Sequence, residues 1–272
     1  MPLEPSASPR AVPNTTPRTP RQAAAAAGCV SLCLLVGNSL ANERVQPFSG
    51  QYEGKKTIAL IPATAKADIA LRRSAQFVVY TMRSRVKWAV LERKFRDCSV
   101  MRIEGDKLLP LEYEHVDESQ PEHNVRTRFD WKENKAITVL GAATKPALAE
   151  IAWPTWDPMS FQVALIALAQ QRRPGDSEAH RVIERGVAKA YEVRFSGAVP
   201  VAGARQNVQA LEIVARKTTG QIQLYLLPQS QWRPFRIAID DVTIDLAASS
   251  RAEAPAGLAE GQVPQCSVLN AR

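Results

Sequence analysis

The sequence has little of what carries chemistry in most enzymes. Beyond residue 41 it has no Gly-x-Ser-x-Gly motif, which excludes the nucleophile elbow of the α/β-hydrolases. It has no glycine-rich phosphate loop, and its basic segments lack the interleaved aromatic residues that stack on bases. We therefore expect no cofactor and no nucleic-acid partner, and favour a non-catalytic protein.

The N-terminus has the features of a secretory signal. Arg10, Arg18 and Arg21 precede Ala23–Leu40, a run without charged residues, and Ala41 ends a small-residue cleavage site. We predict that residues 1–41 comprise a disordered prefix and a signal peptide, and that cleavage near Ala41 leaves the protein in the periplasm or cell envelope. A retained anchor is the second alternative, although its run is diluted by Gly, Ser and Asn. A lipid on Cys29 or Cys33 is the third.

The charge balance is basic, with 35 Lys and Arg against 27 Asp and Glu. Removing residues 1–41, which hold three Arg and one Glu, lowers the formal charge from +8 to about +6. This excess of positive charge indicates either a solvated basic surface or a surface attracted to anionic lipid headgroups. It is spread through Arg72, Arg73, Arg83, Arg85, Lys87, Arg93, Lys94, Arg96, Arg172 and Arg173.

Only two cysteines, Cys98 and Cys266, follow the predicted cleavage site. In an oxidising envelope they are candidates for one disulfide. It would join an early strand to a C-terminal tail rich in Ala, Ser, Gly and Pro, which we expect to be disordered from residue 247. The bond would then contribute little to the fold.

Period-two alternation of apolar and polar residues predicts a chain dominated by short strands. Trp88–Phe95 fits either a short helix or a strand. In Phe235–Leu246 the alternation changes phase at Asp240-Asp241, which is typical of a β-bulge. The other predicted strands are Phe48–Thr57, Lys66–Arg73, Gln76–Val86, Arg96–Glu104, Lys135–Leu140, His180–Arg185, Ala188–Ser196, Val208–Lys217 and Gln221–Leu227.

The clearest hairpin runs from Leu109 to Trp131. A turn at Gln120 pairs Glu112 with Arg128 and Glu114 with Arg126, so that opposite charges meet on the solvent-exposed face. Leu111 would then face Phe129 on the apolar face.

One helix is predicted, over Asp157–Gln171, after a loop at Gly141–Trp153. Asp157 is a good N-cap and Pro158 suits the first helical position. Pro174-Gly175 ends it. One apolar stripe is formed by Phe161, Ala164, Leu165 and Leu168.

Several segments, in this order, resemble the exported bacterial proteins of the domain of unknown function 3108 family. They are Phe48…Tyr52…Gly54, Leu109-Pro110-Leu111…Tyr113, Arg128-Phe129-Asp130-Trp131, Trp156-Asp157-Pro158-Met159-Ser160-Phe161, Leu224-Tyr225 and Trp232-Arg233-Pro234-Phe235-Arg236-Ile237. The resemblance covers most of Pro47–Asp245. It implies an antiparallel β-fold in the bacterial envelope and brings no activity, cofactor or catalytic residue.

Three groups of residues could carry chemistry, and each has a simpler structural interpretation. His115, Asp117, Glu118, Glu122 and His123 match no standard zinc or calcium spacing, and a polar hairpin turn explains them. Asp240, Asp241 and Asp245 could act as paired acids, but a bulge also needs polar residues. Ser84-Arg85-Val86-Lys87 fits Ser-x-x-Lys without its companion motifs. We assign no catalytic or metal-binding residue.

We therefore predict a mainly β fold: an antiparallel meander over residues 42–246, strongly curved or barrel-like, with one principal helix packed on it. The favoured function is non-catalytic binding of an apolar or amphipathic envelope ligand, such as a lipid, or assistance in envelope assembly. The alternatives are a hydrolase of cell-wall or lipid substrates that uses Asp240, Asp241 or a histidine, and an outer-membrane β-barrel. The oligomeric state is not predicted. Candidate ligand-cavity residues are Trp131, Trp156, Phe161, Leu165 and Trp232.

Overall fold

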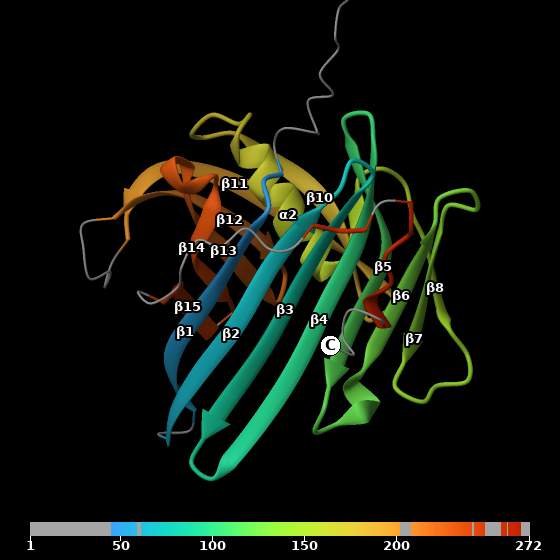
Figure 1. Cartoon of the computed structure of the whole chain (residues 1–272), viewed down its shortest axis with the longest axis horizontal. Helices are drawn as coiled ribbons and strands as arrows, with labels where there is room; N and C mark the ends of the chain where they lie inside the picture. Colours follow the sequence, from blue (N-terminus) through green and yellow to red (C-terminus); the bar gives the residue numbers. More distant parts are fainter. Residues whose placement is uncertain are drawn as a thin grey trace, which may run out of the picture. The chain divides into compact units, whose positions relative to one another are not determined.

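The structure is a computed structural model that describes residues 45–58, 61–201, 208–240, 242–247, 257–259 and 261–267. The predicted signal peptide and its cleavage site lie outside the described residues. Within them the chain forms one fifteen-stranded sheet, in the order β8-β7-β6-β5-β4-β3-β2-β1-β15-β14-β13-β12-β11-β10-β9 (Figure 1). Neighbouring strands are antiparallel except β9 and β10, which are parallel.

Five long strands, β1–β5, run side by side. The bounds of the described strands are β1 (Phe48–Ile58), β2 (Ile61–Arg73), β3 (Phe77–Trp88), β4 (Leu91–Glu104), β5 (Lys107–Asp117), β6 (Val125–Asp130), β7 (Lys135–Leu140), β8 (Ala147–Glu150), β9 (Thr155–Trp156), β10 (Ser177–Glu184), β11 (Val187–Pro200), β12 (Gln209–Lys217), β13 (Gly220–Leu227), β14 (Arg233–Ile239) and β15 (Val242–Leu246). The helical elements are α2 (Pro158–Ala169) and the 3-10 turns η1 (Pro121–His123) and η2 (Pro228–Ser230).

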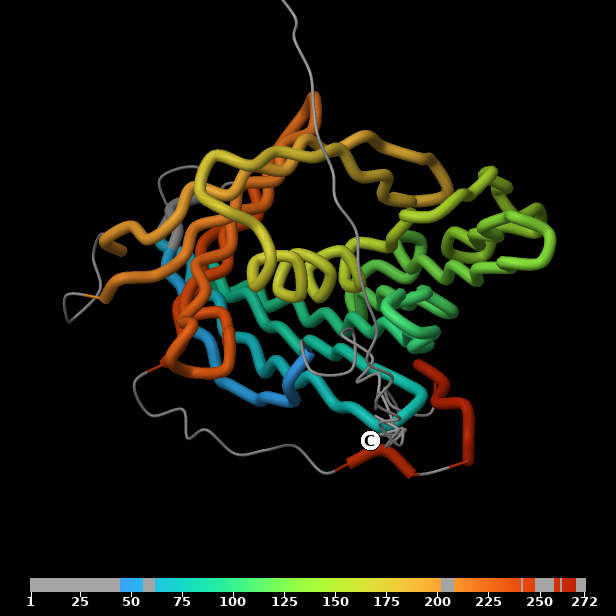
Figure 2. The backbone as a smooth tube through the Cα atoms, turned by 90° about the horizontal axis from the view of Figure 1, so that it is seen from above, coloured from blue at the N-terminus to red at the C-terminus, as the bar shows by residue number. Residues whose placement is uncertain are grey.

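The sheet curls around the single α-helix of the described residues, as Figure 2 shows from above. The two ends of the sheet approach each other, because β8 lies against β11 and β9 lies against β5. The predicted mainly β, strongly curved architecture with one principal helix is therefore confirmed.

The helix α2 begins as the sequence predicts. The carboxylate of Asp157 accepts hydrogen bonds from the backbone N–H groups of Met159 and Ser160, both at 2.9 Å. The Ser160 hydroxyl in turn accepts from the Asp157 N–H, which completes a capping box.

The helix is buried on nearly all sides instead of along one stripe. Phe161, Val163 and Leu165 are fully buried, whereas Leu168 is only partly so. The curved sheet surrounds the helix, so that residues on opposite helical faces become core. The helix ends at Ala169, before the predicted Gln171. No described helix has the length and apolar character needed to cross a membrane.

The predicted register of the central hairpin is confirmed, with Glu112 opposite Arg128 and Glu114 opposite Arg126. Leu111 differs from the prediction. A β-bulge in the β4–β5 pairing, between Val100 and Met101, changes the local phase. Leu111 therefore packs beside Val100 on the outer face of the sheet.

Two local predictions are wrong, and one open alternative is decided. The segment Phe235–Leu246 is two strands, β14 and β15, that pair with each other, so its phase change is a hairpin turn at Asp240 and not a bulge. For Trp88–Phe95 the strand alternative is confirmed over Leu91–Phe95, which belongs to β4, and the helix alternative is excluded. The predicted loop Gly141–Trp153 contains the short strand β8.

The C-terminal segment differs from the predicted disordered tail at residues 257–259 and 261–267, which pack on the sheet. Cys98 and Cys266 form a disulfide with their Cα atoms 5.6 Å apart. Both cysteines are fully buried, in a small cluster with Val79, Val100 and Leu258. The Cys266 backbone N–H also donates to Glu112. The disulfide is therefore part of a packed contact.

Candidate functional site: a cationic face of the sheet

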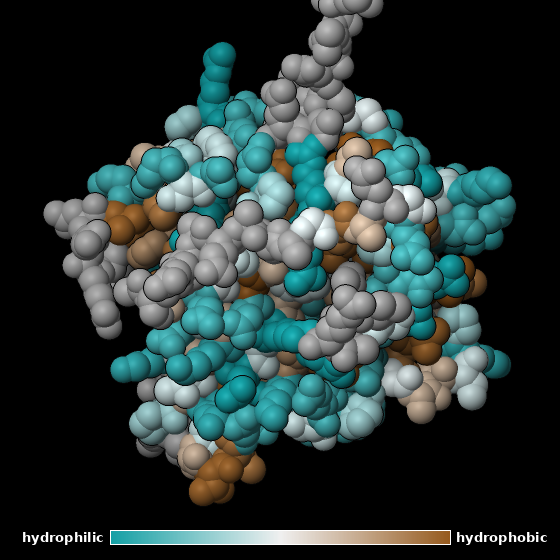
Figure 3. All heavy atoms as spheres, viewed as in Figure 1, coloured by the Kyte–Doolittle hydropathy of each residue, from teal (hydrophilic) through white to brown (hydrophobic). Residues whose placement is uncertain are grey.

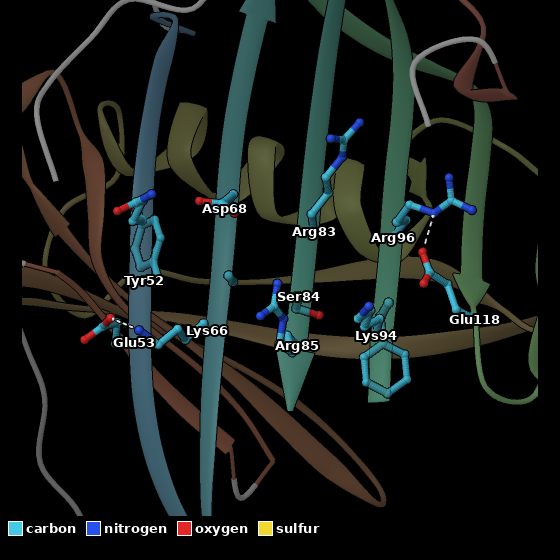
Figure 4. Close-up of a pocket in the computed structure, with 13 residues that line it drawn as sticks. Tyr52, Glu53, Lys66, Asp68, Arg83, Ser84, Arg85, Lys94, Arg96 and Glu118 are labelled. Carbon is cyan, nitrogen blue, oxygen red and sulfur yellow. Dashed lines mark hydrogen bonds and ion pairs between the residues drawn. The ribbon is translucent and has the colours of Figure 1, made fainter. Parts of the chain in front are cut away.

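The outer face of β1–β5 carries an unusual concentration of positive charge. The inner face of these strands packs on α2 through buried residues such as Tyr80 and Ile69. Because side chains alternate along a strand, the residues between the buried ones point away from the helix. Figure 4 shows these outward side chains in front of the strands, with α2 behind them.

One row of cations runs directly across three strands. Lys66 on β2 is the cross-strand partner of Arg85 on β3, and Arg85 is the partner of Lys94 on β4. We call Lys66, Arg85 and Lys94 the cationic row. A carboxylate ends the row on β1, where Glu53 pairs with Lys66 at 2.8 Å. Directly opposed like charges destabilise a sheet, so the row is not explained by strand pairing.

A second row lies two residues along the strands, with a carboxylate in place of the cation on β2. Asp68 on β2 is the partner of Arg83 on β3, which is the partner of Arg96 on β4. Arg96 lies 3.3 Å from the carboxylate of Glu118. Both rows line an open depression of about 480 Å³, in which five cationic side chains outnumber three carboxylates.

A second acidic side chain beside the cationic row, Glu92, is shared among several cations. Glu92 lies 3.0 Å from Lys87, 3.4 Å from Arg85 and 3.9 Å from Lys94. Its hydrogen bond to Lys87 and the charges around it lower the pKa of the Glu92 carboxyl. These ion pairs are solvent-exposed and contribute little to stability. One carboxylate is thus shared by three cations on this face.

A separate polar cluster lies on the inner face of β4 and β5. Asp97 accepts hydrogen bonds from the Tyr113 hydroxyl at 3.2 Å and, through the same oxygen, from His115 Nδ1 at 2.8 Å. Burial opposes protonation of His115, but the bond to Asp97 and its charge raise the His115 pKa. This pair resembles a general base with its orienting carboxylate.

The same strand also holds the helix cap. Ser99 donates from Oγ to Asp157 Oδ2 at 2.8 Å, and both residues are fully buried. Desolvation raises the pKa of Asp157 to about 6. The hydrogen bonds that it accepts from Ser160, Ser99 and Met159 lower the pKa, but by less than desolvation raises it. The cap is thus a buried titratable group that joins α2 to β4.

A model of the family described as a protein of unknown function, DUF3108, matches residues 52–243. The chain belongs to the DUF3108 family. This confirms the resemblance inferred from the ordered segments, and the matched region includes both rows of the cationic face.

One solved structure supports the fold of this DUF3108 chain. It is the beta-barrel-like protein of domain of unknown function DUF1849 from Brucella abortus, with a TM-score of 0.54 and 14% identity, covering 77% of this chain and 99% of that chain. At this identity the likeness concerns the fold alone. A comparison with curated proteins found no match.

Four of the five predicted cavity residues of this DUF3108 chain share one apolar cluster. Trp156, Phe161 and Leu165 are buried in the core around α2, and Trp232 packs partly against it. Trp131 lies in a different cluster, where its ring stacks on Phe129 at 6.1 Å. The structure therefore places the first four together and Trp131 apart from them.

The candidate metal ligands of the hairpin turn bond to other protein groups. His115 bonds to Asp97, while Asp117 binds Arg93 and the backbone N–H of Ser119. His123 lies 3.8 Å from Asp117. The described residues contain no group of three or more His, Cys, Asp and Glu side chains placed to hold a metal ion.

The candidate acids and the Ser-x-x-Lys pair are also separated. Asp240 occupies the β14–β15 turn with φ of 52° and accepts from the Gln221 N–H, whereas Asp245 pairs with Arg236. Asp241 lies outside the described residues. Ser84 and Lys87 are three residues apart on one strand and so point to opposite faces.

The cationic face itself could be found only in part from the sequence. The basic residues of Arg83–Arg96 are visible there, and so is their alternation. Their pairing with Lys66 depends on the β2–β3 register, which no local pattern fixes.

Proposed function

We propose that this protein is a non-catalytic binding protein of the cell envelope, and that its cationic face binds the anionic headgroup of an amphipathic ligand. A phosphate-bearing lipid is the chemical class that fits best. The observation that carries this proposal is the cationic row, in which Lys66, Arg85 and Lys94 are direct cross-strand partners.

The arrangement of charges favours ligand binding over a structural role. Cross-strand neighbours of like charge repel each other, whereas a bound phosphate would neutralise that repulsion. Arginine and lysine together provide both fixed-geometry and flexible donors to phosphate oxygens. The depression is open, so a headgroup can reach the row while its acyl chains stay outside.

The interior of the sheet supports a headgroup site in place of an enclosed acyl cavity. Leu165 and Phe161 of α2 are fully buried inside the curved sheet, where an internal ligand would otherwise lie. The apolar part of an amphipathic ligand is therefore better accommodated outside the sheet.

Two features support export to the envelope. The disulfide between Cys98 and Cys266 is the kind of bond that persists in oxidising compartments. The uncharged run Ala23–Leu40 after three arginines fits a secretory signal. N-terminal sequencing of the protein from the envelope tests this location: a first residue at Asn42 supports it, and an intact Met1 contradicts it.

Calorimetric titration with dihexanoyl phosphatidic acid, which is monomeric at working concentrations, tests the headgroup site. We expect binding that weakens as salt rises, and no binding of dihexanoyl phosphatidylcholine. The double variant Arg85→Gln, Lys94→Gln should lower the affinity about tenfold or more, equivalent to about 1.4 kcal/mol.

A charge-matched control separates the site from net charge. Lys132 and Lys189 are exposed cations outside the cationic face. Replacing both with Gln removes the same charge, and we expect the affinity to stay unchanged. Equal losses in the two double variants would show attraction by net charge only, and absence of phosphatidic acid binding would refute the proposal.

A hydrolase is the second candidate, favoured by the Asp97–His115 pair. His115 is oriented through Nδ1 by Asp97 and its side chain is 25% exposed, so its other ring nitrogen could act as a base. Hydrolysis of p-nitrophenyl esters that is lost in His115→Gln, with unfolding unchanged, would favour this alternative.

A further inference from the structure

The β3–β4 hairpin ends in an exposed apolar tip. Val90 is 96% exposed and Leu91 is 55% exposed. Among the described residues, no other turn exposes two large apolar side chains to this extent. Figure 3 shows this apolar group at the lower edge of the molecule, bordered by hydrophilic residues, at the position of the β3–β4 turn in Figure 1. An exposed apolar group with a polar border is a candidate interaction surface.

The turn itself is built against ordinary turn preferences. Trp88 pairs with Leu91, so Ala89 and Val90 form a two-residue loop. Such loops favour Gly, Asn or Asp, because a residue in them takes a positive φ. Ala89 has φ of 50°, a region that suits glycine. Stability and solubility would both favour polar turn residues, so neither explains this apolar sequence.

Cations lie directly behind the tip on the same two strands. Lys87 is three residues from Val90 and forms an ion pair with its cross-strand partner Glu92. Arg85 and Lys94 form the next outward-facing pair. At about 3.3 Å per residue, these charges lie roughly 10–17 Å from the tip along the strands. An apolar element that enters the boundary between headgroups and acyl chains penetrates about 5–10 Å. The cations would then lie at the level of lipid phosphates.

We infer that the β3–β4 hairpin tip inserts into the surface of an anionic membrane, with Val90 and Leu91 in the acyl boundary and Lys87, Arg85 and Lys94 on the headgroups. The attraction to headgroups rests on the proposed function, whereas the insertion does not. Apolar and cationic residues acting together are the two signals that peripheral membrane binding requires.

Flotation with vesicles of phosphatidylethanolamine and phosphatidylglycerol tests the insertion. The protein is used as purified from the envelope, with the N-terminus that it carries there. We expect the wild type to bind these vesicles, and the variant Val90→Ser, Leu91→Ser to bind about tenfold more weakly or worse. The matched control is Val187→Ser, Leu148→Ser, which removes one exposed valine and one exposed leucine elsewhere. It should bind as the wild type does.

Depth is measured by quenching of Trp88, the partner of Leu91, with brominated acyl chains. Quenching should occur in the wild type and disappear in Trp88→Phe and in Val90→Ser, Leu91→Ser. Vesicle binding without quenching, or binding equal in the tip variant and the wild type, would overturn the insertion. Wild-type protein that binds no vesicles would overturn it as well.

The two proposals fail in different ways. The tip variant should keep the affinity of the wild type for dihexanoyl phosphatidic acid, because the cationic row is intact. If Arg85→Gln, Lys94→Gln loses phosphatidic acid binding and binds vesicles more weakly, while its membrane-bound fraction still shows Trp88 quenching, both proposals are supported. Quenching without phosphatidic acid binding would support the tip alone.

Discussion

Ser99 on β4 donates a hydrogen bond from Oγ to Oδ2 of Asp157, over 2.8 Å, and so ties the sheet to the first turn of α2. Asp157 already caps the helix through its other oxygen. One buried carboxyl therefore serves both the helix start and the contact between helix and sheet. The stability of the interior should depend on the protonation of this group.

Folding stability should fall as the pH rises through the Asp157 titration. Desolvation raises the pKa of Asp157 from 3.8 to about 6, so the folded protein binds a proton more tightly than the unfolded chain does. The stability contributed by this proton is fully present below pH 3.8 and is lost as the pH rises toward 6. The full difference corresponds to about 3 kcal/mol.

Asp157→Asn is the control for this titration. Asparagine is an equally good N-cap and does not titrate, and the Ser99 hydroxyl can accept where it now donates. Urea unfolding of both proteins between pH 4 and 7 should show the wild type losing stability relative to the variant. Parallel pH profiles would contradict the prediction.

Leu165→Ala should destabilise the protein by about 2–5 kcal/mol, because the side chain is fully buried in the middle of α2. Phosphatidic acid binding at the outer face should not change. Leu148→Ala, at a residue that is 64% exposed, is the control and should cost less than about 0.5 kcal/mol. A small loss in Leu165→Ala would show that α2 packs loosely.

Much of the architecture could be predicted because its signals are local. Alternation located most of the strands, and opposite charges set the register of Glu112 with Arg128. Asp157 and Pro158 located the helix start. Family membership follows from the same ordered segments.

The errors arise where tertiary contacts override local patterns. A single stripe predicted one buried face for α2, but the sheet encloses the helix and buries Val163 as well as Leu165. The composition of the tail predicted disorder, yet Cys266 is held by Cys98 and Glu112. The phase change at Asp240 fits both a bulge and a turn, which only the pairing of β14 with β15 distinguishes.

The candidate site depends on register, which is why it could not be predicted. The sequence shows basic residues on several strands, but not that Lys66, Arg85 and Lys94 are direct neighbours. The Asp97–His115 pair likewise joins residues 18 positions apart on adjacent strands.

Cys266→Ser should lower the free energy of unfolding by several kcal/mol. The bond closes a loop of 168 residues, for which the chain-entropy model gives about 5 kcal/mol. Reduction of the wild type with dithiothreitol should reproduce the loss, and it should leave Cys266→Ser unaffected. An unchanged midpoint in the variant would show that the packed C-terminal segment does not stabilise the sheet.

Like-charge repulsion within the cationic row should lower the folding stability of the protein. Arg85 lies between Lys66 and Lys94, and its exposed ion pair with Glu92 contributes little. Arg85→Gln should therefore stabilise the protein by about 0.5 kcal/mol at low salt, and the gain should vanish near 1 M salt.

Lys135→Gln is the matched control, because Lys135 lies between Asp130 and Glu150, two partners of opposite charge. The same change there should leave stability unchanged or reduce it. Urea unfolding at 10 mM and 1 M sodium chloride measures both variants. If Arg85→Gln also destabilised the protein at low salt, the row would be a stabilising part of the sheet, and the argument that its charges are arranged for a ligand would fail.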